Sequence, residues 1–192
     1  MRAPPFDAGA MHRAYNRIQL RQPSNGIRPN PTMSSAPVTI RPARPEDRAA
    51  VLAILAETFA DTWRPQLTAA AIDDYHRRRV AETFVDAALP GFLVAELDGT
   101  VIGFGNREAG FVDSLHVAAA GRRRGVARAL MAGLEARMRA DGIALAALET
   151  DTFNEASQGL YLALGYVEVA RYPDEEWNSG LTTIRYEKSL TP

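Results

Sequence analysis

A stretch that predicts a β-strand, FVDSLHV at residues 111–117, is followed by a short loop and then by RRRGVA at residues 122–127. Apolar residues recur with helical spacing from there to residue 139, so the second stretch stands where a strand turns into a helix. The first turn of a helix has backbone N–H groups without intrahelical acceptors, and its dipole favours negative charge. The three arginines add positive charge, and the glycine lets an anion approach the main chain closely. The junction therefore predicts a phosphate-binding site.

The composition limits the classes of protein. The chain has 192 residues, a formal net charge of −1 and no cysteine, which excludes disulfides, thiolate metal sites and a cysteine acyl-enzyme. Its three histidines are widely spaced, so we expect no metal. The near-neutral charge argues against a nucleic-acid partner, and no apolar run is long enough to span a membrane. We expect one cytoplasmic domain, and Lys188 as the single lysine is typical of a GC-rich bacterial genome.

Residues 1–35 differ from the rest of the chain. They contain five arginines, one acid and several prolines, and they show no sustained apolar period. We expect a flexible tail, or extra sequence upstream of a true start at Met33. A mitochondrial leader is the alternative, but prolines and asparagines interrupt the amphipathic helix that such a leader needs. The domain itself is expected at residues 36–192.

Periodicity and turn signals predict the order β-α-α-β-β-β-α-β-α-β-β. Asp98-Gly99 is a strong hairpin signal, because both central residues of a type I′ turn need positive φ. This order predicts an α/β (α+β) domain with a mixed, mostly antiparallel sheet of about seven strands flanked by four helices. Strands are expected at 38–41, 92–97, 101–107, 111–117, 144–150, 166–172 and 181–187, and helices at about 45–59, 68–89, 126–139 and 154–164.

Other phosphate-binding motifs are absent. The chain has no Gly-x-x-x-x-Gly-Lys-Ser/Thr, and Glu108 stands where a dinucleotide fingerprint beginning at Gly103 and Gly105 needs its third glycine. Nucleotide hydrolysis and nicotinamide chemistry are therefore disfavoured.

Two spaced motifs carry a family resemblance. The strand ends in Leu115-His116-Val117 and is followed by an Arg-x-x-Gly-x-Ala core, although Ala119 and Gly121 replace the usual proline and tyrosine. Downstream, Asn154 is followed by Tyr161 and then by the tripeptide Leu-Gly-Tyr at 164–166. From residue 38 to residue 190 the chain resembles the GCN5-related N-acetyltransferase (GNAT) family.

The resemblance implies acetyl-CoA as cosubstrate. Its pyrophosphate would lie on the amides of residues 123–127, beside the arginine side chains. Its pantetheine arm would pair with main-chain groups of Leu115 and Val117, in a V-shaped gap between the strands at 111–117 and 144–150. The residues expected to bind the coenzyme are Leu115, His116, Val117, Arg122, Arg123, Arg124, Gly125, Val126, Ala127 and Asn154. Asn154 could equally cap its helix, and the His116 side chain is expected to pack or to face outward rather than to catalyse.

Acetyl transfer needs two proton movements. By resemblance, Tyr161 is the general acid that protonates the departing thiolate. Asp113 is the first candidate for the general base, because strand alternation places it on the face of Leu115. Glu149 is its rival, Glu108 is a third candidate, and a chain of water molecules could also do the work.

The acceptor is less defined. Acids and aromatic residues suit a cationic amine, but acidic surface loops are common. A solvated acidic loop is at least as well supported as an amine-binding site. The main hypothesis is an N-acetyltransferase acting directly on a small-molecule or protein amine in a ternary complex, and the alternative is an acyl-CoA-binding sensor without turnover. The oligomeric state stays open, with a homodimer as one option. The acceptor candidates are Glu57, Asp61, Trp63, Asp73, Asp74 and the loop at 173–180.

Overall fold

The computed structural model of the protein describes residues 37–174 and 181–191. Its seven strands form one sheet in the order β1-β2-β3-β4-β5-β7-β6, in which β4 and β5 are parallel and all other neighbours are antiparallel. This is the mixed sheet that the sequence predicts. The strands are β1 (Thr39–Pro42), β2 (Leu93–Leu97), β3 (Thr100–Glu108), β4 (Phe111–Val117), β5 (Leu145–Asp151), β6 (Val167–Pro173) and β7 (Thr182–Ser189).

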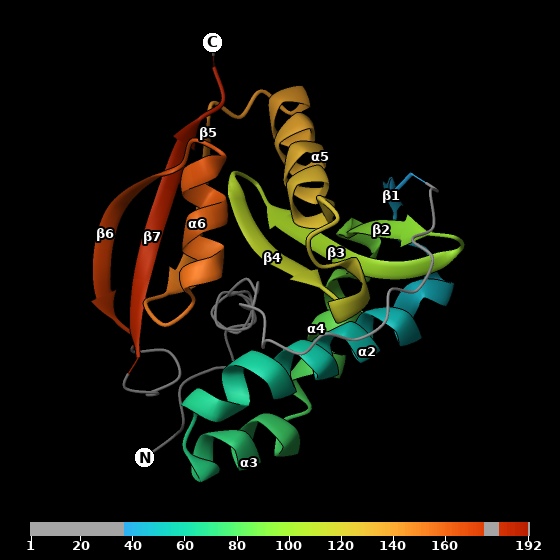
Figure 1. Cartoon of the computed structure of the whole chain (residues 1–192), viewed down its shortest axis with the longest axis vertical. Coiled ribbons are helices and arrows are strands. Elements are labelled where there is room, and N and C mark those ends of the chain that lie inside the picture. Colours follow the sequence, from blue (N-terminus) through green and yellow to red (C-terminus); the bar gives the residue numbers. More distant parts are fainter. Residues whose placement is uncertain (1–36, 175–180, 192) are drawn as a thin grey trace, which may run out of the picture.

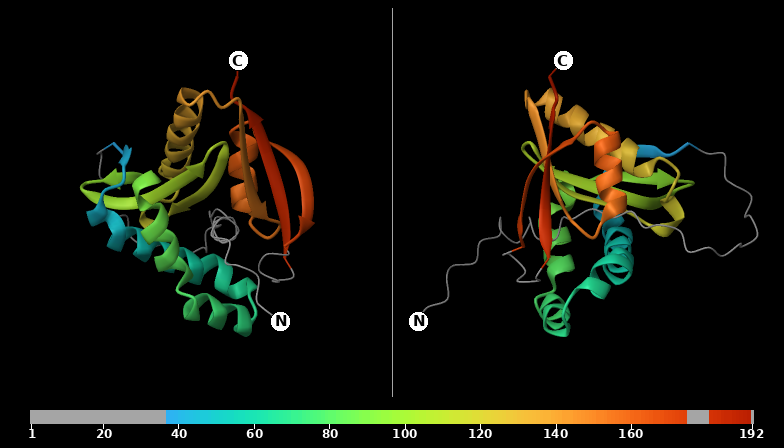
Figure 2. Two further views of the ribbon diagram at one scale, coloured as in Figure 1. Left: turned by 180° about the vertical axis from the view of Figure 1, so that it is seen from behind. Right: turned by 60° about the vertical axis from the view of Figure 1, so that its left-hand side comes forward.

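Helices cover both faces of the sheet. On one face α5 and α6 enclose an apolar cluster centred on Leu115 and Leu134, and on the other α2, α3 and α4 enclose a cluster centred on Phe92 and Phe104. Figures 1 and 2 show α2 and α3 together at one end of the molecule, away from the C-terminus. The helices of the described residues are α2 (Arg48–Thr58), α3 (Ala69–Arg77), α4 (Val80–Ala88), α5 (Val126–Ala140) and α6 (Glu155–Ala163), joined in part by the short turns η1 (Pro45–Asp47), η2 (Phe59–Trp63), η3 (Arg64–Gln66), η4 (Leu89–Gly91) and η5 (Ala119–Gly121).

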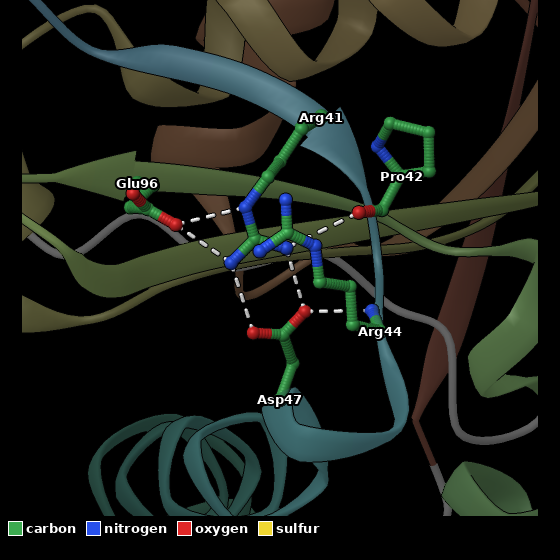
Figure 3. A network of polar contacts seen from close by, with 5 residues as sticks. All are labelled: Arg41, Pro42, Arg44, Asp47 and Glu96. Carbon is green, nitrogen blue, oxygen red and sulfur yellow. Dashed lines mark hydrogen bonds and ion pairs between the residues drawn. The ribbon is translucent and has the colours of Figure 1, made fainter.

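Local contacts define the backbone at two places, of which the hairpin at residues 98–99 was expected. Asp98 and Gly99 have φ of 50° and 75°, which confirms the tight hairpin between β2 and β3. At the start of α2, the Asp47 carboxylate accepts hydrogen bonds from the Arg44 backbone N–H at 2.7 Å and from Arg41 at 2.7 and 2.9 Å (Figure 3). Arg41 also donates to Glu96 on β2 at 2.8 Å. This network connects the edge strand β1 to β2 and to the start of α2.

The helix predicted at 68–89 is two helices. Arg79 adopts a left-handed φ of 49° and separates α3 from α4. Tyr75 and Val80 are both buried, yet on an unbroken helix they would point about 140° apart. The break lets each helix turn its apolar side to the same cluster. The predicted tail at 1–35 and residues 175–180 of the predicted acceptor loop lie outside the described residues.

Candidate active site

The sheet opens between β4 and β5. These strands pair at one position, Phe111 opposite Ala147, where the Ala147 N–H donates to the Gly110 carbonyl at 2.8 Å. Gly110 allows this approach, because a Cβ there would stand 2.7 Å from the Leu145 carbonyl oxygen. From this point towards Val117 the described residues form no further ladder between the two strands. The predicted gap therefore begins where β4 and β5 leave each other.

The loop before α5 presents free amides. Arg123 and Gly125 have left-handed φ of 61° and 76°, and α5 begins at Val126. No N–H of residues 123–128 makes a hydrogen bond of ordinary geometry to an acceptor in the described part of the chain. Successive amides that point outward from such a turn form a nest for an anion. The backbone thus has the form that a pyrophosphate site requires.

The three arginines of the loop are not equivalent. Arg123 is exposed and Arg124 half-buried, and neither forms an ion pair with a described residue. Arg122 is largely buried, and its Nη2 lies 3.2 Å from Asp61 Oδ2 and 3.6 Å from Glu57 Oε1. The expectation that all three arginines bind the coenzyme stays a prediction, and for Arg122 the structure adds these two acids, which are distant in sequence.

Asp113 lies in a β-bulge. The register of β3 and β4 shifts after Asn106, which pairs with Ser114, so Asp113 has no residue opposite it. Asp113 is buried, and its Oδ2 is 3.5 Å from Asn106 Nδ2. Simple alternation with Leu115 therefore fails here, and the carboxylate is turned to the face of Asn106 and Ser114. The assignment of Asp113 as base stays a prediction.

His116 packs within the core, as expected for its side chain. Its ring stacks on Phe104 at a centroid distance of 5.0 Å, and its Nδ1 is 3.0 Å from Thr58 Oγ1. Burial lowers the pKa of the imidazole to about 3, so His116 is neutral near pH 7. The His116 side chain thus belongs to the cluster around Phe104, and a contact of His116 with the coenzyme stays a prediction.

Tyr161 is fully buried on α6. Its ring packs against Tyr166 and Tyr186 at centroid distances of 5.9 and 5.8 Å. No described residue forms a hydrogen bond with its hydroxyl, and burial raises the pKa of the phenol well above its usual value of 10. The hydroxyl therefore keeps its proton, and the role of Tyr161 as the general acid stays a prediction.

Asn154 caps α6. Its side chain accepts a hydrogen bond from the Ser157 N–H at 3.3 Å, which confirms the capping role. A contact between Asn154 and the coenzyme stays a prediction.

The rival bases differ in their surroundings. Glu149 on β5 accepts a hydrogen bond from the Tyr172 hydroxyl and lies 3.5 Å from Arg185. Glu108 is exposed at the end of β3. Both contacts fall on the same carboxylate oxygen of Glu149, its Oε1.

The sequence did not reveal the π-helical turn η2 that follows α2. Its last residue, Trp63, meets Phe153 edge-on at a centroid distance of 5.4 Å, so η2 touches the loop that leads from β5 into α6. Such turns often occur at functional sites, but they have no reliable sequence signal.

Residues 37–174 and 181–191 contain neither a candidate membrane-spanning helix nor a cluster of metal-binding side chains. No helix there combines the length and the apolar character needed to cross a membrane. No group of three or more metal-binding side chains occurs in the same residues.

Comparisons with known proteins agree with this geometry. A family model described as the acetyltransferase (GNAT) family matches residues 49–166, more than half of the chain. The chain belongs to the GNAT acetyltransferase family. No match was found among curated proteins.

Solved structures show the same fold. A GCN5-related N-acetyltransferase from Rhodopseudomonas palustris is 24% identical with a TM-score of 0.67, covering 84% of this chain and 99% of that one. The PaiA N-acetyltransferase from Thermoplasma acidophilum, in complex with coenzyme A, is 18% identical with a TM-score of 0.66 (80% and 99% covered). YncA from Salmonella typhimurium, solved with acetyl-CoA, is 22% identical with a TM-score of 0.62 (82% and 96% covered).

Proposed function

We propose that the protein transfers an acetyl group from acetyl-CoA to a primary amine in a ternary complex. The observation that carries the proposal is the opening of the sheet after the single pair of β4 and β5, beside a loop with free amides. The edge of β4 beyond its single pair with β5 suits the pantetheine amides, and the amides of residues 123–128 suit the pyrophosphate. PaiA and YncA, which share the fold, were solved with coenzyme A and acetyl-CoA, which supports this cosubstrate.

The chemistry uses one acid and one base. The neutral amine attacks the thioester carbonyl, the C–S bond breaks, and Tyr161 gives its proton to the sulfur. The proton lost by the amine passes to Asp113, directly or through water. Glu149 is the weaker candidate, since Tyr172 and Arg185 engage its carboxylate. The chain has no cysteine, so no thiol can carry the acetyl group between the substrates.

The acceptor is an amine of a small molecule or of a protein. Two acids first considered for a cationic acceptor, Glu57 and Asp61, instead contact the loop before α5. The remaining candidates for recognition of the acceptor are Trp63, Asp73, Asp74 and the loop at 173–180.

A panel of amines with acetyl-CoA, followed by the release of free thiol, tests the proposal. We expect at least one amine to accelerate thiol release, and initial-rate lines that intersect in double-reciprocal plots. Parallel lines would contradict the ternary complex. Coenzyme binding without turnover for any amine would favour the second candidate, an acyl-CoA sensor.

A further inference from the structure

The Arg122 side chain forms ion pairs with acids of α2 and η2, which are distant from it in the sequence. Its guanidinium meets Asp61 at 3.2 Å and Glu57 at 3.6 Å, and the same Glu57 Oε1 accepts a hydrogen bond from the Ala119 N–H at 2.7 Å. Ala119 begins the short turn η5, and Arg122 follows its last residue. Glu57 therefore contacts the first residue of η5 and the residue that follows η5, immediately before the free amides.

The charge around Arg122 does not suit direct phosphate binding. Two carboxylates already surround one guanidinium group, so the cluster has an excess of negative charge. A pyrophosphate that approached this group would be repelled by Glu57 and Asp61. Arg123 and Arg124 have no acidic partner among the described residues and can turn to an anion at lower cost.

The two acids lie at the junction of α2 and the π-helical turn η2. Glu57 lies in the last turn of α2 and Asp61 in η2, and a spacing of four residues brings both carboxylates to one side of the helix. The same turn ends at Trp63, which contacts Phe153 just before α6. One π-helical turn thus touches the coenzyme loop and the segment that leads to the Tyr161 helix.

We propose that Arg122 is a positioning residue whose ion pairs with Glu57 and Asp61 fix the coenzyme loop against α2 and η2, while the pyrophosphate binds the amides and the side chains of Arg123 and Arg124. This inference rests on the proposed function, because it concerns the same coenzyme site. It differs from the expectation for Arg122 drawn from the sequence, which assigned its charge to the phosphate.

Whether coenzyme A binds more tightly or more weakly after loss of one of these acids tests the inference. Glu57→Gln and Asp61→Asn each remove a negative charge near an anion site, so electrostatics alone would tighten coenzyme A binding. If the acids position the loop, each substitution loosens it, and coenzyme A should bind about tenfold more weakly because binding must then order the loop. Glu46→Gln, at an exposed acid in η1, is the matched control and should leave the affinity unchanged.

Calorimetric titration with coenzyme A measures these affinities without turnover. The salt dependence separates the arginines: Arg124→Gln should reduce the slope of affinity against salt, whereas Arg122→Gln should weaken binding and keep the slope. Tighter or unchanged coenzyme A binding by Glu57→Gln and Asp61→Asn, or a reduced salt slope for Arg122→Gln, would overturn this inference. The proposed function would not be affected. A wild-type protein that does not bind coenzyme A would overturn the proposed function as well.

Discussion

Replacement of Tyr161 by phenylalanine removes one hydroxyl and leaves the packing of three tyrosine rings in place. The hydroxyl is fully buried and has no hydrogen-bond partner among the described residues. A buried polar group without a partner costs about 1–3 kcal/mol. We therefore expect Tyr161→Phe to leave the free energy of unfolding unchanged or to raise it by about 1 kcal/mol, which corresponds to about 2–4 °C in Tm.

The effect on turnover should have the opposite sign. A positioned general acid contributes about 10²–10⁴ in rate, which is about 3–5 kcal/mol of the activation barrier. We expect kcat to fall by at least about a hundredfold and the Kd of coenzyme A to stay nearly constant. A variant that is at least as stable yet far slower cannot be explained by damage to the fold.

Thiol release under initial-rate conditions and thermal unfolding of the unliganded protein measure both effects. Tyr186→Phe is the matched control, because its ring lies 5.8 Å from Tyr161 and is also buried. A kcat for Tyr161→Phe within about threefold of wild type would refute the general-acid role. A loss of more than about 1 kcal/mol of stability would mean that the hydroxyl has an internal partner.

Three further predictions concern charge and backbone geometry. Burial lowers the pKa of His116 to about 3. NMR should therefore show a neutral ring down to about pH 5, and stability should fall by about 1.4 kcal/mol per pH unit below about 6.5, where the unfolded chain takes up the proton; a ring titrating near 6.5 would contradict this. Hydrogen bonds from Arg41 lower the pKa of Asp47 below 3.8, so its charge stabilises the fold above that pH. In urea titrations at pH 7, Asp47→Asn should cost about 2 kcal/mol, and the difference should shrink as the pH falls below the ordinary pKa; a difference independent of pH would argue against the ion pair. Gly125→Ala and Gly99→Ala, with φ of 76° and 75° and no atom within 4 Å of the new Cβ, should each cost about 1 kcal/mol, but only the first should weaken coenzyme A binding in calorimetry. Equal affinities would remove Gly125 from the site.

The sequence predicted features that depend on neighbouring residues. The hairpin at Asp98-Gly99, the cap at Asn154 and the helix start at Val126 each depend on local φ preferences or on a nearby side chain. Their free energy arises within a few residues, so a pattern of a few letters contains the information. The alternation of polar and apolar residues likewise predicted the seven strands.

Tertiary structure decided where the partners of Arg122 and Asp113 lie. Asp61 and Arg122 are 61 positions apart, and the bulge at Asp113 depends on its register against β3. The break at Arg79 arises because α3 and α4 must both turn apolar faces to one cluster. By itself the sequence determined the order of strands and helices, the family motifs and the glycine turn before α5, because these are local properties of the chain. Only packing decided that Arg122 meets Asp61 and Glu57 and which side of β4 the Asp113 carboxylate reaches, because both depend on contacts between distant segments.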